Sequence, residues 1–202
     1  MKLRTVEANP AALDLLGSEP RIALLGDVHG DLDHLRIALD VLHERGIRAV
    51  IQLGDFGLLW PRTAWERHAQ RITRRLAELG QALFFADGNH EDFERLAHFT
   101  IDPATGLPWI TSRIAHLPRG YRITRADGQV LAALGGAGSI DFERRALGSS
   151  WWLEEQINDE DLARAMTAEP PMEASRPRLG DPQGDGCPIR RRSPMTVEGS
   201  SR

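Results

Sequence analysis

Three short segments of this chain place glycine beside side chains that bind metal ions. They are residues 26–31 (Gly-Asp-Val-His-Gly-Asp), residues 54–57 (Gly-Asp-Phe-Gly) and residues 87–91 (Asp-Gly-Asn-His-Glu). In the first segment, Asp27 and His29 lie two residues apart and can place a carboxylate and an imidazole on one ion. Mixed oxygen and imidazole donors suit Mn, Fe or Zn better than a pure Mg or Ca site. The residue types therefore predict a site for one of these metals.

The two later segments offer a second metal site and an acid. Asn89 suits a second ion, and Asp55 could bridge the two ions. Two ions about 4 Å apart can hold a phosphate and lower the pKa of a shared water, which makes hydroxide available near neutral pH. His90 stays off the metals in this interpretation and could protonate the leaving alkoxide as a general acid. The chemistry that these residues predict is hydrolysis of a phosphate ester.

Each segment directly follows an apolar run that is typical of a buried strand. The runs are residues 22–25, 49–53 and 82–86, and helix-like stretches from about residue 32 to 45 and from about residue 64 to 79 lie between them. Alternation of strand and helix predicts parallel strands joined by right-handed crossovers. All three segments then lie at the carboxyl edge of one sheet, where open α/β sheets build their sites.

The three motifs, in this order, resemble those of the calcineurin-like metallophosphoesterase family. The resemblance extends from about residue 21 to residue 157. It implies that Asp27 and His29 bind one metal, that Asp55 bridges, that Asn89 binds the other metal and that His90 assists catalysis. Alone, an aspartate beside glycine could be an ordinary turn residue. The order of the motifs makes that alternative the weaker one.

A fourth segment also resembles the family, and the chain differs from the family in two respects. Residues 135–141, which follow the second strand of an expected hairpin, resemble the next strand exit of the family. The family supplies three further histidines from its C-terminal half, one after a strand and two in a Gly-His-X-His motif, yet this chain has no histidine after His116. The resemblance implies that one metal loses one ligand and the other loses two. Leu58 stands where many relatives have a second aspartate, which in some of them orients the catalytic histidine.

The composition of the chain changes after residue 166. Residues 158–166 have the pattern of a short helix with Asn158 as its cap and an acidic first turn. Residues 167–202 hold six of the twelve prolines and few large apolar side chains, which predicts disorder and suggests a truncated or out-of-frame end. The predicted parts are an N-terminal lead-in (1–20), a truncated metallophosphoesterase domain (21–166) and a disordered tail (167–202).

The composition of the chain limits which partners and which cellular location we expect. A chain of 202 residues with 41% hydrophobic content fits one α/β domain plus a tail. The net charge of −4 argues against a nucleic-acid partner, although three arginines at residues 190–192 could touch anions. The single cysteine, Cys187, excludes an intrachain disulfide. The first 20 residues lack the pattern of a signal peptide and no apolar run approaches about 18 residues, so we expect a cytoplasmic location and no membrane partner.

Four tryptophans and one histidine have a structural and a functional interpretation. Trp60, Trp109, Trp151 and Trp152 could line a substrate mouth, because aromatic faces stack on nucleobases. More often such tryptophans cap the edge of a core or close a loop, and the structural role is favoured. His116 lies near a possible strand but matches no ligand motif, so we do not expect it to reach the metals.

The predicted fold is an α/β sandwich of the metallophosphoesterase type whose C-terminal part is incomplete. The predicted activity is hydrolysis of a phosphate mono- or diester by a water activated between two metal ions. The alternative is a catalytically impaired or dead relic, or a binding module that keeps the fold. Loss of central strands would leave an apolar sheet face uncovered, so we expect self-association or binding to another protein. Fold analogy does not choose the substrate.

Overall fold

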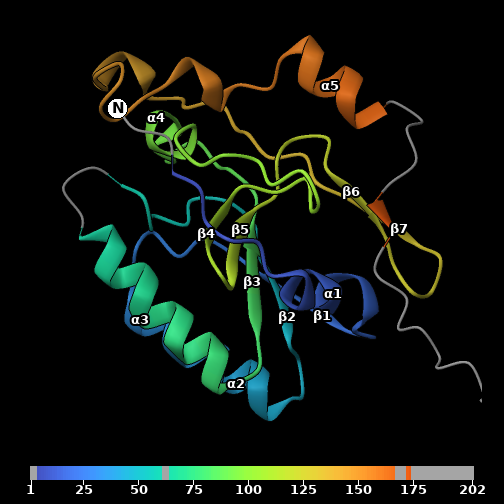
Figure 1. Ribbon diagram of the computed structural model, residues 1–202. Helices are drawn as coiled ribbons and strands as arrows, with labels where there is room; N and C mark the ends of the chain where they lie inside the picture. Colours follow the sequence, from blue (N-terminus) through green and yellow to red (C-terminus); the bar gives the residue numbers. More distant parts are fainter. Residues whose placement is uncertain (1–3, 61–63, 167–171, 174–202) are drawn as a thin grey trace, which may run out of the picture.

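A five-stranded sheet forms the centre of the computed structural model, which describes residues 4–60, 64–166 and 172–173 (Figure 1). The strands lie in the order β1-β2-β3-β5-β4. They are β1 (Ile22–Leu25), β2 (Ala49–Gln52), β3 (Ala82–Phe85), β4 (Trp109–Thr111) and β5 (Ile114–His116). β1, β2, β3 and β5 run parallel, and β4 pairs antiparallel with β5. The predicted α/β architecture with a parallel sheet is confirmed.

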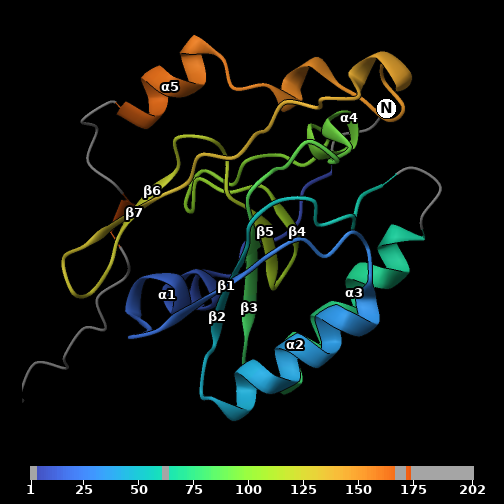
Figure 2. The same ribbon diagram turned by 180° about the vertical axis from the view of Figure 1, so that it is seen from behind.

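Helices cover the two faces of this sheet and its carboxyl edge. They are α1 (Pro10–Ser18), α2 (Leu32–Glu44), α3 (Trp65–Glu78), α4 (Phe93–Leu96) and α5 (Asp159–Met166). Figures 1 and 2 show α2 and α3 side by side across the sheet from α1. α2 begins directly after the first motif, because the side chain of Asp31 accepts a hydrogen bond of 2.9 Å from the backbone N–H of His34 and caps the helix.

The alternation of side chains along the strands divides the core into two layers. Val50 and Leu83 belong to the layer that includes the apolar sides of α2 and α3, whereas Ile51 and Phe84 belong to the layer that includes α1. Every residue of β2 and β3 is buried. Burial on both faces is typical of parallel sheets, and it explains why these strands are continuous apolar runs in the sequence.

A second, smaller sheet has the order β7-β6-β8. β6 (Arg122–Thr124) and β7 (Val130–Ala132) form the expected antiparallel hairpin. β8 (Met172–Glu173) pairs parallel with β6. The backbone groups at the free edge of β6 pair with these two residues, and the disorder expected of the tail stays a prediction. The rest of the tail at 167–202 lies outside the described residues, and the division of the chain at residue 166 stays a prediction.

An irregular segment, which we call the cover segment (residues 133–158), lies over the carboxyl ends of the central strands (Figure 1). It contains two short 3-10 helices, η1 (Phe142–Arg144) and η2 (Leu153–Glu155). It leads into α5, where Asn158 accepts a hydrogen bond of 2.9 Å from the backbone N–H of Asp161. The helix predicted with Asn158 as its cap is therefore confirmed.

Two leucines on the α1 face of the sheet remain exposed beside β1. Leu24 is 66% exposed and Leu53 is 52% exposed. Both lie on the same side of the sheet as Ile51, the residue that pairs with Leu24. Ile51 is 5% exposed, whereas the two leucines are not buried, so α1 covers this side of the sheet only in part. Among the described residues, no helix combines the length and the apolar character that are needed to cross a bilayer.

Candidate metal centre

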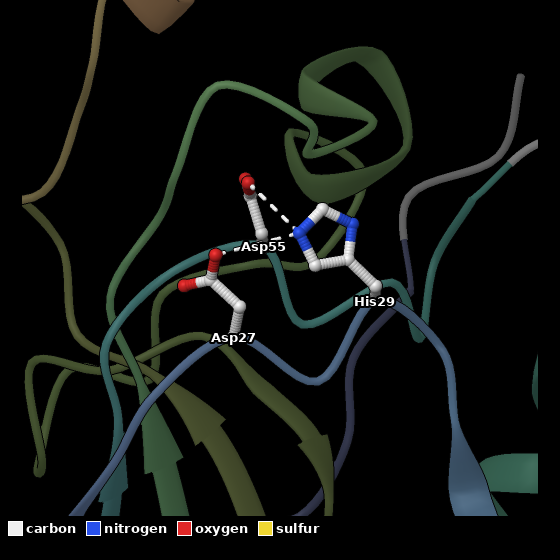
Figure 3. A group of neighbouring side chains, drawn as sticks. All are labelled: Asp27, His29 and Asp55. Carbon is white, nitrogen blue, oxygen red and sulfur yellow. Dashed lines mark ion pairs between the residues drawn. The ribbon is translucent and has the colours of Figure 1, made fainter.

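The first two motifs meet at the carboxyl edge of the sheet. Figure 3 shows the imidazole of His29 between the carboxylates of Asp27 and Asp55. His29 Nε2 lies 3.4 Å from Oδ2 of Asp27 and 3.6 Å from Oδ2 of Asp55. One ligand atom from each residue lies within 4.8 Å of the others, which is close to the spacing of about 3–4 Å between donors around one ion. We call these three residues the triad.

The two oxygens of Asp55 face different parts of the site. Oδ1 accepts a hydrogen bond of 2.9 Å from the backbone N–H of His90, and Oδ2 faces His29. The side chain of Asp55 is 11% exposed, whereas those of Asp27 and His29 are 64% and 48% exposed. The buried carboxylate therefore joins the second motif to the third, and the open side of the triad is accessible to ions and ligands.

The backbone at two residues of the triad has a left-handed conformation. His29 has φ +48° and Asp55 has φ +54°, and these are the two non-glycine residues with positive φ in the described part of the chain. Such a conformation costs an L-residue about 1–2 kcal/mol. Backbone hydrogen bonds of 2.8 Å from His29 N–H to Asp55 O and of 3.0 Å from Gly30 N–H to Phe56 O hold the two loops together. Strain of this kind, held by surrounding structure, is concentrated at functional sites.

Glycines in the motifs permit a close approach of neighbouring loops. A Cβ atom on Gly57 would lie 2.4 Å from the backbone nitrogen of Gly30, and Gly57 has φ +73°. A Cβ atom on Gly88 would lie 2.3 Å from Oδ1 of Asp55. Any side chain at either position would push apart the loops that carry the triad and the third motif.

The third motif lies beside the triad and contributes two side chains to the site. The ring centroid of His90 is 5.5 Å from that of His29 and 6.1 Å from that of Trp60. The amide nitrogen of Asn89 donates a hydrogen bond of 3.0 Å to Oγ of Ser139. His90 is therefore a neighbour of the triad, and Asn89 lies between the third motif and the cover segment.

Glu91 and Leu58, two other positions of the motifs, serve the fold. Glu91 is 2% exposed, and its Oε1 accepts a hydrogen bond of 2.8 Å from the backbone N–H of Phe56. Burial raises the pKa of this carboxyl to about 8. Leu58 is 2% exposed and belongs to the core layer of α2 and α3. Both residues hold the loop that follows Asp55.

Arg145 also belongs to the site, and the only sign of it in the sequence is an aspartate four residues earlier, Asp141. Its Nη2 lies 3.0 Å from Nε2 of His90, and its Nη1 lies 3.2 Å from Nδ1 of the same ring. A neutral imidazole has one acceptor nitrogen, so at most one of these contacts is a hydrogen bond. Nε of Arg145 lies 2.8 Å from Oδ1 of Asp141, and this hydrogen bond lowers the pKa of Asp141. The cover segment thus places a guanidinium group beside His90.

His116 lies against the third motif instead of the triad. Its Nε2 is 3.1 Å from Oδ1 of Asp87, whose Oδ2 accepts hydrogen bonds of 2.8 and 2.6 Å from Arg119. Burial opposes ionisation of Asp87, but the hydrogen bonds from His116 and Arg119 outweigh it and lower the pKa of this carboxyl. Asp87 and His116 therefore stabilise the loop that precedes Asn89.

The four tryptophans divide between the two interpretations. Trp109 and Trp152 are 1% and 6% exposed, and Trp151 packs on Phe142 with ring centroids 5.6 Å apart. The surroundings of these three tryptophans agree with a structural role. Trp60 instead borders the triad, because its ring centroid lies 5.8 Å from that of His29 in an edge-on arrangement. One of the four thus lies beside the triad.

The donor set of the triad fits a divalent metal ion, since the ligand atoms of two carboxylates and an imidazole lie within 4.8 Å of one another. Comparison with known proteins gave one match. No curated protein and no solved structure matched this chain. The family model described as calcineurin-like phosphoesterase matches residues 20–184, which is more than half of the chain. This chain therefore belongs to the calcineurin-like phosphoesterase family.

Proposed function

We propose that this protein hydrolyses a phosphate mono- or diester with a water activated between two metal ions. Membership in the family supports a metal-dependent phosphoesterase in general, and the family generally binds divalent metals. The observation that carries the proposal is the convergence of Asp27, His29 and Asp55, whose ligand atoms lie within 4.8 Å of one another at the sheet edge. Strained backbone at two of these residues supports the same conclusion.

Each residue of the site has a role in this proposal. Asp27 and His29 would hold one ion, Asn89 would hold the other, and Asp55 would be a ligand shared by the two. Bound Mn, Fe or Zn would polarise a phosphoryl oxygen and lower the pKa of a bound water. His90, beside the triad, donates a proton to the leaving alkoxide.

Arg145 binds the phosphate of the substrate in the same proposal. Its guanidinium group lies 3.0 Å from His90 and is held by Asp141. A cation in this position, next to residues that would hold metal cations, favours an anionic ligand. The planar fork of an arginine suits phosphate oxygens, to which it donates two hydrogen bonds at once.

One observation favours the alternative of an impaired enzyme or a binding module. Within the described residues, the triad is the one group of three His, Cys, Asp or Glu side chains placed to hold an ion. A second ion would therefore depend on Asn89, Asp55 and water. The alternative predicts one weakly held ion and no hydrolysis.

Hydrolysis of p-nitrophenyl phosphate, a monoester, and of bis-p-nitrophenyl phosphate, a diester, tests the proposal. We expect chelator-treated full-length protein to regain activity when Mn²⁺ is added. Asp55→Asn is expected to lose that activity, whereas Asp33→Asn, at an exposed aspartate in the first turn of α2, keeps it. Wild-type protein that is as inactive as Asp55→Asn at millimolar Mn²⁺ would favour the alternative.

Self-association through the partly covered sheet face is a separate proposal. Leu24 and Leu53, which are 66% and 52% exposed, would be covered by a second copy of the chain. Light scattering should give a mass above that of the monomer, and Leu24→Gln together with Leu53→Gln should lower it. A monomer in both proteins would contradict this proposal. The cytoplasmic location and the absence of a nucleic-acid partner stay predictions from the sequence.

A further inference from the structure

A chain of hydrogen bonds connects Asn89 to a buried carboxyl group of the cover segment. The amide nitrogen of Asn89 donates to Oγ of Ser139 at 3.0 Å. Ser139 in turn donates twice to Glu155, from its hydroxyl to Oε2 at 2.8 Å and from its backbone N–H to Oε1 at 2.6 Å. Asn89 belongs to the third motif, Ser139 and Glu155 belong to the cover segment, and none of them belongs to the triad.

Burial gives this chain of hydrogen bonds a fixed direction. Glu155 is fully buried and Ser139 is 7% exposed, so water does not compete freely for their hydrogen bonds. Because both oxygens of Glu155 accept from Ser139, the hydroxyl hydrogen points towards Glu155. The lone pairs of the hydroxyl then face Asn89. They can accept a hydrogen bond from the amide nitrogen of Asn89, whereas its amide oxygen has no hydrogen to donate.

The orientation of the Asn89 amide decides whether it can bind a metal. Metal ions bind the oxygen of a carboxamide, and its nitrogen is a donor of hydrogen bonds. With the nitrogen committed to Ser139, Oδ1 is the atom that is left for a metal. The loop of Asn89 also lies against the triad, because the next residue, His90, donates its backbone N–H to Asp55.

We propose that Ser139 and Glu155 are positioning residues that hold the Asn89 amide with its oxygen towards the metal centre. This inference rests on the proposed function, since it concerns a ligand of the second ion. Residues that orient a metal ligand change metal affinity by about 10–100-fold when they are removed. The cover segment thereby sets the affinity of the metal centre without contacting the metal.

Glu155→Gln tests the direction of the hydrogen bonds with almost no change in shape. The glutamine must keep its carbonyl oxygen on the backbone N–H of Ser139, because its NH₂ group would oppose that N–H. Its NH₂ group then donates to Oγ of Ser139. The serine hydroxyl becomes free to donate to Oδ1 of Asn89, which reverses the amide. If Glu155 had only a structural role, reversal of the Asn89 amide would leave the binding of Mn²⁺ unchanged.

Mn²⁺ binding to the full-length protein, measured by calorimetry without substrate, is the first readout. We expect Glu155→Gln and Ser139→Ala each to raise the dissociation constant of the weaker Mn²⁺ ion about tenfold or more. Glu154→Gln and Ser149→Ala, at exposed positions of the cover segment, should bind Mn²⁺ as the wild type does. Wild-type affinity in both Ser139→Ala and Glu155→Gln would overturn the proposal.

The side-chain amide resonances of Asn89 in the metal-free protein give the second readout. Asn89→Asp identifies these signals by their disappearance. We expect slow hydrogen exchange of the amide in the wild type and faster exchange in Ser139→Ala. Equal, fast exchange in both would overturn the proposal even if Glu155→Gln failed to fold. Slow exchange of the Asn89 amide in a wild-type protein that does not bind Mn²⁺ would contradict the proposed function and leave the positioning of the amide supported.

Discussion

Two regions of this protein build one site by different physical means. The loops at residues 26–31 and 54–57 leave regular parallel strands, and they are joined by backbone hydrogen bonds and by glycines in close contact. The cover segment has little regular structure, and buried charged side chains hold it in place. The difference indicates that backbone geometry fixes the triad, whereas side-chain electrostatics fix the residues that surround it.

Arg119 is the main anchor of the cover segment. It donates hydrogen bonds to the carboxylates of Asp87 and Asp161 and to the backbone oxygens of Glu154 and Gln156. Burial opposes the charge of Arg119, but the hydrogen bonds to Asp161 and Asp87 outweigh it and raise the pKa of the guanidinium. One side chain therefore ties the cover segment and α5 to the loop that precedes Asn89.

Arg119→Met should have the largest effect, because it removes the anchor and takes the arginine partner away from two buried carboxylates, Asp87 and Asp161. Such a change costs about 3–5 kcal/mol of unfolding free energy. Urea denaturation of the full-length protein measures it, with Arg144→Met, at an exposed arginine of η1, as the control. Equal stability of Arg119→Met and Arg144→Met would show that charge does not hold the cover segment.

The effect of this anchor should depend on pH in a defined direction. Burial opposes ionisation of Asp161, but hydrogen bonds from Arg119 and from the backbone of Asn158 outweigh it and lower its pKa. The stabilisation is therefore complete above the unfolded value of about 4 and is lost as the pH falls through the lower folded value. The difference in stability between wild type and Arg119→Met should shrink in this acid range.

Gly57→Ala tests the other region and should have the next largest effect. The left-handed backbone costs alanine about 1–2 kcal/mol, and a Cβ atom 2.4 Å from Gly30 N adds overpacking of about 1–3 kcal/mol. Gly80→Ala is the matched control, since Gly80 has φ +65° and its Cβ would meet nothing within 4 Å. Calorimetric unfolding and Mn²⁺ affinity are the measurements. If Gly57→Ala and Gly80→Ala lose equal stability, the close contact between Gly57 and Gly30 contributes nothing to the free energy of unfolding.

Arg145→Gln should have the smallest effect and shows whether the cover segment takes part in the chemistry. Loss of a charge-assisted hydrogen bond to phosphate should raise KM about tenfold, since such bonds contribute about 1.5–3 kcal/mol. We expect kcat to change less and Arg144→Gln to match the wild type. A fall in kcat with KM unchanged would mean that Arg145 acts through His90 and does not bind phosphate.

The strands and the first helices of this fold could be predicted from the sequence because their signals are local. Apolar runs mark β1, β2 and β3, and Asp31 with its neighbours marks the start of α2. Parallel topology then brings residues 27 and 55 to one edge without any knowledge of side-chain contacts. The structure indeed places Asp27, His29 and Asp55 together.

The surroundings of the triad could not be predicted in the same way. The contacts of Arg119 with Asp87, of Arg145 with His90 and of Ser139 with Asn89 join residues 32 to 55 positions apart. No periodicity or turn pattern encodes such pairs, and an arginine or glutamate in an irregular segment is usually solvated. Glu155, which is fully buried, has the sequence surroundings of an exposed residue.

The position of bound Mn²⁺ in crystals of the full-length protein tests the central claim most directly. Anomalous scattering locates the ion without reference to activity. We predict an anomalous peak between Asp27, His29 and Asp55, and its absence in crystals of Asp55→Asn. A peak elsewhere on the protein, with none between these three residues at millimolar Mn²⁺, would contradict the assignment of the triad as the metal centre.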